Sequence, residues 1–392
     1  MRKALTYILA LMLMACSSSS GGDDPIVTPQ EEEQQTMLSF YVYSPEHPIL
    51  TRGNAGESNA SEAEAKVNSL QIWVFESATG KLAAYYKPSS TVRLNGDEGN
   101  DVYQMPVSHD FANRRPRVDV YVLANATTNT VGKIYDKSTT RTQLQEALLE
   151  NDHFGSSPLT TSVPADGLPM SGALLNQPVT GEKPVLRVGT DYSSMATVRL
   201  VRMVSKLHFA FGALKGSNLQ ITGITFDETD ENGNKGLLAY SEFLFLKEAY
   251  TGRNSNVSNY IETKVSLLPS AISVLEVTDP LEYVFVDGVE SAQDYETRIL
   301  KAINATSGDK LTSVGPYYLH ESDKKLKGKV TYTVSGGSEM TAPFEMADAG
   351  DFSRNHTWLV YAYYGDAVLE FNLVDVNSWQ DKDVRNHDTY NW

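Results

Sequence analysis

The sequence predicts a mainly β protein built of β-sandwiches, with one or two short helices. Three observations predict this all-β fold: many short runs rich in branched and aromatic residues, turn-forming residues between the runs, and few helical segments. A parallel α/β sheet would need a helix between most strands, and such helices are missing from the pattern. The strand-like runs are 37–43, 70–75, 118–124, 198–211, 219–226, 329–334, 357–364 and 368–376.

Two segments carry apolar residues at helical spacing, and each lies in its own half of the chain. These segments are residues 140–151 and 292–303. A chain of 392 residues is long for one domain and natural for two. We therefore expect two β domains, 37–190 and 191–392, with the boundary just before the long strand that starts at Val198.

The N-terminus has the pattern of an export signal. Arg2 and Lys3 precede an apolar run that ends at Met14. The run is too short to span a bilayer, which needs about 20 apolar residues, so residues 1–15 are interpreted as a signal peptide. The run leads into Leu-Met-Ala-Cys, which looks like a lipobox and predicts lipidation, palmitate included, at Cys16. The alternative is an incidental cysteine at the end of an ordinary signal peptide.

Cys16 is the only cysteine, so no disulfide can form within one molecule. The stretch that follows it is rich in Ser and Gly, and residues 16–36 are interpreted as a flexible lipidated tether. No second long apolar segment is present, so attachment to the outer membrane is expected to come from the lipid alone.

The charge balance excludes some partners. The chain has 49 acidic and 33 basic residues and a net charge of −16. Such a surface argues against binding nucleic acid and against electrostatic docking on anionic lipid. With 41% hydrophobic and 21% charged residues, the composition is that of an ordinary globular protein.

No catalytic motif is found. The seven histidines form no zinc-binding pair, no catalytic cysteine is available, and nucleophile elbows and phosphate loops are missing. We therefore predict no enzyme activity, no catalytic residues and no cofactor. A secreted hydrolase with a triad assembled from distant residues stays an alternative.

The acidic stretch 227–234 resembles a calcium loop at first sight. Aligning Gly233 with the glycine of such a loop places Ala239 at the twelfth position, which cannot supply the required carboxylate. A hairpin that turns at Asn232 and Gly233 is favoured, and no metal site is predicted.

The chain has 21 tyrosines, and Tyr361, Tyr363 and Tyr364 cluster in one run. Together with Trp73 they could stack on sugars, which would make the chain a surface glycan-binding lipoprotein. Amphipathic aromatic residues on a sandwich strand are the favoured interpretation.

The chain resembles the fimbrillin superfamily of Bacteroidales, the type V pilin subunits. The matching elements are spread along most of the length and begin with the lipobox at Cys16. The others are the strand Leu70–Phe75, a strand ending in Ala-Asn at Val120–Ala126, a Pro-Met-Ser-Gly element in Leu168–Gly172, the strand Val198–Leu207, Arg354–His356 and Trp379.

The resemblance implies two transthyretin-like β-sandwich domains and a structural subunit of a cell-surface fimbria that mediates adhesion. It also implies polymerisation by strand exchange after an arginine-specific protease removes an N-terminal strand. The residues that match are the strand 37–43 and a connector that contains Arg52 and Gly53, where cleavage would release the propeptide 37–52 together with the lipid. The alternative is that Arg52 is an ordinary exposed arginine.

The implied donor strand is the C-terminal segment 366–392. Within it, an alternating run predicts a strand that could complete a neighbour, and such head-to-tail exchange builds a filament. The implied partners are other subunits in a homo- or heteropolymer and a ligand on a host or bacterial surface. A fimbrial anchor or tip protein that does not polymerise is the alternative. The donor residues are Val368, Leu369, Phe371, Leu373, Val374 and Val376.

Overall fold

The computed structural model describes a large part of residues 35–392. Several predicted features lie outside the described residues: Cys16, Arg52 with Gly53, the acidic stretch 227–234, Trp379 and the tail from residue 377 onward. The described ranges are 35–43, 61–87, 94–95, 100–150, 159–189, 195–226, 238–239, 241–245, 260–261, 265–321, 326–346, 354–365 and 367–376.

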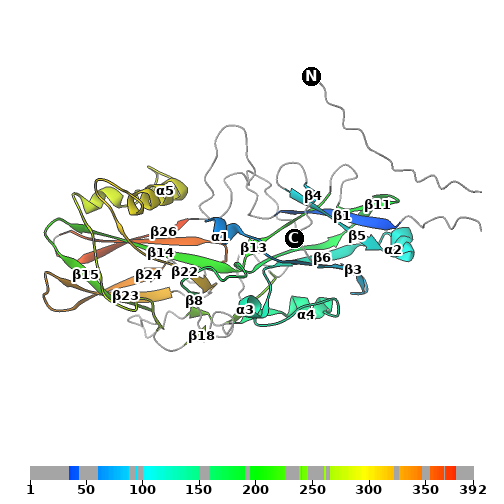
Figure 1. Cartoon of the computed structure of the whole chain (residues 1–392), viewed down its shortest axis with the longest axis horizontal. Helices are drawn as coiled ribbons and strands as arrows, with labels where there is room; N and C mark the ends of the chain where they lie inside the picture. Colours follow the sequence, from blue (N-terminus) through cyan, green and yellow to red (C-terminus); the bar gives the residue numbers. More distant parts are fainter. Residues whose placement is uncertain are drawn as a thin grey trace, which may run out of the picture. The chain divides into compact units, whose positions relative to one another are not determined.

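Eleven strands that lie between residues 36 and 202 build a first sandwich of two sheets (Figure 1). The two sheets share one apolar core, to which the interior faces of both contribute. The first sheet contains β10 (Val179–Glu182), β11 (Val185–Val188), β1 (Thr36–Tyr43), β5 (Asn100–Val107), β4 (Leu94–Asn95) and β12 (Thr197–Arg199). The second contains β13 (Val201–Arg202), β9 (Met170–Gln177), β6 (Val118–Ala124), β2 (Leu70–Glu76) and β3 (Leu82–Tyr86).

The strands β2 and β6 are buried on both faces, which explains their near-continuous apolar runs. One face lies in the core of the first sandwich. On the other face, Trp73 and Tyr121 pack in a separate cluster with Leu144, Phe245 and Tyr318. This second cluster joins the first sandwich to residues of the later part of the chain.

A second sandwich follows, again with its own apolar core between two sheets. One sheet contains β26 (Leu369–Val376), β25 (Thr357–Tyr364), β14 (Val204–Leu214), β22 (Thr312–His320), β8 (Leu159–Thr160) and β21 (Glu276–Val277). The facing sheet contains β19 (Val265–Ser266), β15 (Leu219–Phe226), β23 (Leu326–Val334), β24 (Met340–Met346) and β20 (Ile272–Ser273). Two small pairs are β16 (Leu238–Ala239) with β18 (Tyr260–Ile261), and β17 (Ser241–Phe243) with β7 (Leu148–Glu150).

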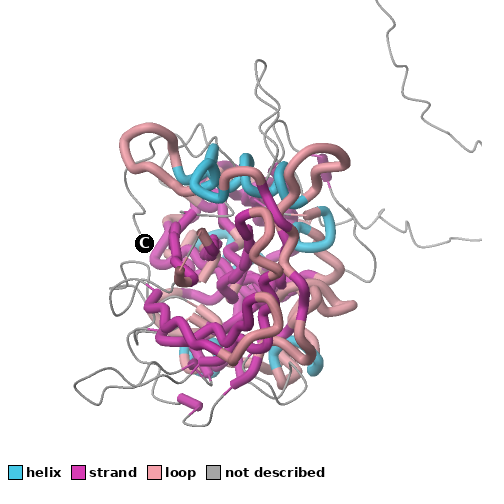
Figure 2. The backbone as a smooth tube through the Cα atoms, turned by 90° about the vertical axis from the view of Figure 1, so that its left-hand side faces the viewer, coloured by secondary structure: helices cyan, strands magenta, loops and turns pink. Residues whose placement is uncertain are grey.

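The helices lie outside the layers of strands (Figure 2). The helix predicted over 292–303 is confirmed with the same bounds: Ser291 caps it, and Tyr295 and Ile299 are buried on one face. The helices are α1 (Glu62–Ala65), α2 (His109–Arg114), α3 (Thr128–Val131), α4 (Arg141–Gln145) and α5 (Ala292–Ile303), with the 3₁₀ helix η3 (Pro280–Tyr283).

The predicted all-β fold of tandem sandwiches is confirmed, and two element predictions need correction. The helix expected over 140–151 ends at Gln145, because Leu148–Glu150 pair with β17 instead. The single strand expected over 198–211 is divided among β12, β13 and β14, which belong to three different sheets. The chain passes from the first sandwich to the second between Arg202 and Val204, and the division into domains at residues 190 and 191 stays a prediction.

The buried ring of His208 on β14 predicts a pH dependence of stability. Burial, and then the positive charge of Lys206, lower its pKa from 6.5 to about 4, so the folded chain keeps the ring neutral, with Nε2 2.7 Å from the hydroxyl of Ser313. The unfolded chain takes up the proton first as pH falls. We expect the free energy of unfolding to drop by roughly 2 kcal/mol between pH 6.5 and 5 through this residue. In urea unfolding at several pH values, the unfolding free energy of His208→Gln should fall less between pH 6.5 and 5 than that of the parent chain. An equal fall in both chains would show that His208 is not its cause.

Candidate assembly site

The strand β1 lies in the interior of its sheet, with a hydrogen-bonded partner on each side. It pairs antiparallel with β5 along its whole length, from Thr36 to Tyr43. On its other side it runs parallel first to β11 and then to β12. Its sequence, rich in aromatic and branched residues, suits a strand buried on one face. Taking β1 away would leave unpaired backbone groups along both neighbouring edges.

The core face of β1 is made of Leu38, Phe40 and Val42, which are 0%, 0% and 2% exposed. They pack in the core of the first sandwich with Tyr103 and Met105 of β5. Full burial of such side chains contributes about 1.5–3 kcal/mol each. Without β1 the sandwich would therefore expose an apolar groove as well as two open strand edges, and an extended apolar segment is the ligand that fits it.

The chain leaves β1 at Tyr43 and re-enters the described structure at Ser61, just before α1. The predicted cleavage residues, Arg52 and Gly53, belong to the connection between these two points and lie outside the described residues. This connection is the only covalent link from β1 to the rest of the sandwich. Cutting it would leave β1 held by non-covalent contacts alone.

The helix α1, which follows that connection, is fixed by a buried carboxylate. The side chains of Ser61 and Glu64 cap the helix reciprocally. Glu64 is 1% exposed, and its Oε1 lies 3.0 Å from Nζ of Lys206 and 2.7 Å from the hydroxyl of Tyr318, which donates to it. Burial raises the pKa of Glu64, but the Lys206 charge and the hydrogen bonds from Tyr318 and Ser61 outweigh burial and lower it overall.

The residues around Glu64 come from both sandwiches. Nε of Arg202, on β13, donates to the Glu64 carbonyl at 3.0 Å, and its Nη1 donates to Oδ1 of Asn355 at 3.3 Å. The backbone N–H of Asn355 donates in turn to the carbonyl of Val204 at 2.8 Å. We call Glu64, Arg202, Lys206, Tyr318 and Asn355 the junction cluster. It ties α1 to β13 of the first sandwich and to β14 and β22 of the second.

Arg354, which was part of the family resemblance, lies beside the junction cluster. It is buried, its Nη2 pairs with Glu321 at 2.8 Å, and its Nη1 donates to the carbonyl of Leu244 at 3.0 Å. Ser171, from the Pro-Met-Ser-Gly element, donates to the same carbonyl at 2.5 Å. Ser171 and Arg354, two motif residues that are far apart in sequence, therefore bind the same carbonyl group.

The structure explains why asparagine and glycine occupy two further motif positions. Asn125 adopts a left-handed backbone with φ of 56°, and its side chain accepts from the N–H of Asn68 and donates to the carbonyls of Lys66 and Leu168. A Cβ at Gly172 would lie 2.2 Å from the carbonyl oxygen of Arg199. Only glycine lets these two chain segments approach so closely. Asn125 therefore joins the segments around Lys66 and Leu168, and Gly172 lets β9 approach β12, a neighbour of β1.

The predicted donor residues lie on or just before β26, at the edge of its sheet. This strand pairs with β25 through all eight of its residues and with no other described strand. Its core-facing residues differ in burial: Leu369 is buried, whereas Phe371 and Leu373 are only partly buried. Val374 and Val376 are buried on the other side, and Val368 is 55% exposed. Whether this segment is donated to a neighbour stays a prediction.

The sugar-stacking hypothesis is wrong for the residues it named. Trp73 and Tyr361 are 0% exposed, and Tyr363 is also buried. The indole N–H of Trp73 donates to the carbonyl of Asp136, and the Tyr361 hydroxyl donates to that of Pro280. These rings are core residues with satisfied polar atoms, so they present no face to a glycan.

The described part of the chain lacks two kinds of feature, a cluster of metal ligands and a membrane-spanning helix. No three His, Cys, Asp or Glu side chains there gather as metal ligands would. No helix within the described ranges is both long and apolar enough to cross a membrane.

Comparison with known proteins assigns the first sandwich to a family. Residues 38–200 match the family of the major fimbrial subunit protein (FimA). Residues 38–200 are a fimbrillin domain. The match begins within β1 and ends between β12 and β13, so it includes the strands of the first sandwich except β13 and the first two residues of β1. The family is one of fimbrial structural subunits and not of enzymes, and the resemblance to the fimbrillin superfamily is confirmed.

Solved structures give weaker likenesses over most of the chain. A candidate cell adhesion protein from Parabacteroides distasonis is 13% identical with a TM-score of 0.47, and the match covers 87% of this chain and 97% of that one. The C-terminally truncated tip fimbrial protein Mfa3 of Porphyromonas gingivalis is 14% identical with a TM-score of 0.42, covering 87% and 99%. A fimbrial assembly protein from Parabacteroides distasonis is 14% identical with a TM-score of 0.41, covering 87% and 96%. The search of curated proteins found no significant match.

Proposed function

We propose that this chain is a polymerising structural subunit of a cell-surface fimbria. In this proposal it is exported, lipidated at Cys16 and held at the outer membrane until an arginine-specific protease cuts after Arg52. The observation that carries the proposal is the position of β1. It is an interior strand with a fully buried apolar face, joined to its sandwich only through the segment that contains Arg52.

The physical basis is β-augmentation. Loss of β1 leaves open edges on β5 and on β11 with β12, together with the groove that held Leu38, Phe40 and Val42. Main-chain hydrogen bonds to an incoming strand supply affinity, and alternate side chains supply specificity. A filament results because each copy would both receive and donate a strand.

The segment around β26 has a pattern that suits this groove. Leu369, Phe371 and Leu373 repeat the order of a leucine, a phenylalanine and an aliphatic residue found at Leu38, Phe40 and Val42. Phe371 and Leu373 are only partly buried in their own sandwich. Moving them into a groove that buries them fully would remove additional apolar surface from water. We propose the C-terminal segment that begins with β26 as the donor.

A non-polymerising anchor or tip protein is the second candidate. The complete pairing of β26 with β25 favours this candidate, because a subunit that donates no strand keeps β26 in its own sandwich. Such a protein would occupy one end of the fimbria and donate no strand to another subunit. An adhesion ligand on a host or bacterial surface is compatible with either position.

Treatment with an arginine-specific protease tests the proposal. We expect the purified lipid-free precursor to yield a mature chain that starts at Gly53, followed by ladders that resist SDS without boiling. Arg52→Lys is the matched control, because it keeps the positive charge but removes the cleavage site, and it should stay monomeric. N-terminal sequencing and unheated SDS gels provide the readouts. A chain that is cut after Arg52 and yet stays monomeric would contradict polymerisation and support the anchor or tip role.

A further inference from the structure

The strand β26 is covered on both faces although it lies at the edge of its sheet. Its core face contributes Leu369 to the second sandwich. Over the opposite face lies α5, whose Tyr295 and Ile299 pack in one cluster with Val374 and Val376. An edge strand forms backbone hydrogen bonds with one neighbouring strand only. The packing of α5 against β26 therefore adds a second set of contacts that hold this strand in place.

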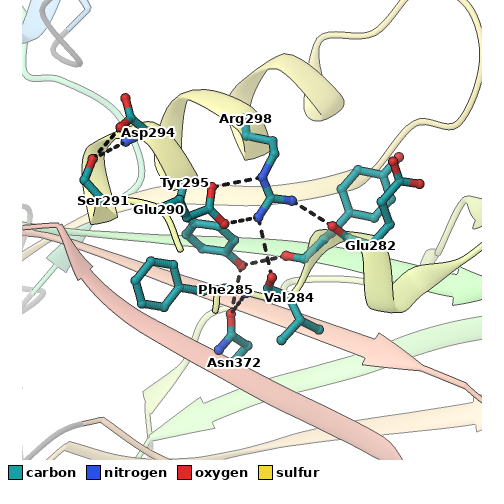
Figure 3. Close-up of polar contacts among 10 residues, drawn as sticks. Glu282, Val284, Phe285, Glu290, Ser291, Asp294, Tyr295, Arg298 and Asn372 are labelled. Carbon is teal, nitrogen blue, oxygen red and sulfur yellow. Dashed lines mark hydrogen bonds and ion pairs between the residues drawn. The ribbon is translucent and has the colours of Figure 1, made fainter. Parts of the chain in front are cut away.

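Polar contacts at the middle of β26 also hold this strand against α5 (Figure 3). Oδ1 of Asn372 accepts a hydrogen bond from the backbone N–H of Phe285 at 2.8 Å, and it lies 3.0 Å from the Tyr295 hydroxyl. The same hydroxyl lies 2.9 Å from the carbonyl of Tyr283. Asn372 therefore binds both α5 and the segment that precedes it. We call that segment, residues 280–290, the strap.

Arg298 on α5 fixes the strap without contacting β26 (Figure 3). Its Nη1 donates to the carbonyl of Glu282 at 2.9 Å, and its guanidinium pairs with the Glu290 carboxylate. The same guanidinium lies 5.0 Å from the ring centre of Tyr295, within cation–π range. The strap, α5 and Asn372 thus form one connected set of contacts.

We propose that the strap and α5 act as a latch that keeps β26 in its own sandwich, and that opening this latch controls when β26 becomes available to a second copy of the chain. The inference rests on the proposed function, because it concerns the release of the proposed donor. Asn372 is the positioning residue through which the latch holds the strand. Its replacement leaves the N–H of Phe285 without an acceptor, which weakens the closed state.

Deuterium exchange and assembly rates of two variants test the latch. Asn372→Val removes the acceptor while keeping a residue suited to a strand, and Arg298→Gln loosens the strap while leaving β26 unchanged. Lys301→Gln is the matched control, because it removes a positive charge from an exposed position on the same helix as Arg298 and lies outside the proposed donor strand. In the uncleaved chain we expect the β26 amides of both variants to exchange about tenfold faster than in the parent chain. After cleavage, SDS-resistant ladders should form faster by a similar factor, and the control should match the parent chain in both measurements.

The two readouts separate the latch from the proposed function. Unchanged exchange of β26 in both variants overturns the latch, whether or not the chain assembles. Faster exchange with an unchanged ladder rate overturns its control of assembly. If the cleaved parent chain forms no ladder, the proposed function fails, while the exchange data still decide whether α5 and the strap hold β26.

Discussion

Replacing Phe40 with alanine is expected to destabilise the precursor strongly and to leave the assembled filament unchanged. Phe40 is fully buried at the centre of β1, and removal of a buried phenylalanine side chain costs about 3–5 kcal/mol. In the filament the same position would be occupied by a neighbour's strand, because β1 has been released. Denaturant unfolding of the uncleaved chain and the temperature at which ladders dissociate in SDS provide the two measurements.

Ile72→Ala is the matched control for Phe40→Ala. Ile72 is buried in the same core but belongs to β2, which stays in the mature chain. It should therefore weaken both the precursor and the filament. If Phe40→Ala lowers the dissociation temperature of the ladders as much as Ile72→Ala does, then β1 remains in the filament and strand replacement is excluded.

Breaking the pair between Glu64 and Lys206 is expected to be the second large effect. Removing one member of a buried ion pair leaves an uncompensated charge and costs about 3–5 kcal/mol. Both side chains are buried, and their charged atoms are 3.0 Å apart. We therefore expect Glu64→Leu alone to destabilise the chain strongly, and Glu64→Leu combined with Lys206→Met to recover much of the loss. Urea unfolding at pH 7 of the two single variants and the double variant measures the coupling.

Acid should reproduce part of the Glu64→Leu effect. The pKa of Glu64 is lowered in the folded chain, so its contribution to stability is complete above the unfolded value of 4.5 and is lost as pH falls through the lower folded value. The parent chain should lose this contribution below pH 4.5, and the double variant should not. Equal stabilities of the parent chain and both single variants at pH 7 would show that the junction cluster does not tie α1 in place.

The sequence predicts those elements whose local pattern decides their structure. Helix α5 has the bounds that its apolar stripe predicts, and in the structure Ser291 caps its first turn. Strand β25 has the bounds that the sequence predicts, and β1 begins one residue earlier than predicted, since branched and aromatic residues fill both. The helix over 140–151 failed because Leu148–Glu150 find a pairing partner in β17, far along the chain. Local spacing contains no information about that partner.

The junction cluster was missed for the same reason. Ser61 and Glu64 form a local capping signature, which could have indicated the start of α1. The buried role of Glu64 depends on Lys206 and Tyr318, which are 142 and 254 residues away. Burial likewise excludes the alternative role of Trp73 and Tyr361 in sugar binding, which stayed open because composition cannot tell an exposed aromatic residue from one inside a sandwich.

The central claim is that a neighbour's strand takes the place of β1, and site-specific photocrosslinking from β5 tests it most directly. Tyr103 is buried and lies directly opposite Phe40 in the register of β1 and β5. A photoreactive phenylalanine derivative at position 103 should crosslink to residues 36–43 in the precursor. In cleaved, SDS-resistant ladders it should crosslink to residues 366–392 of another copy. Crosslinks to residues 36–43 that persist in the ladders would contradict the account.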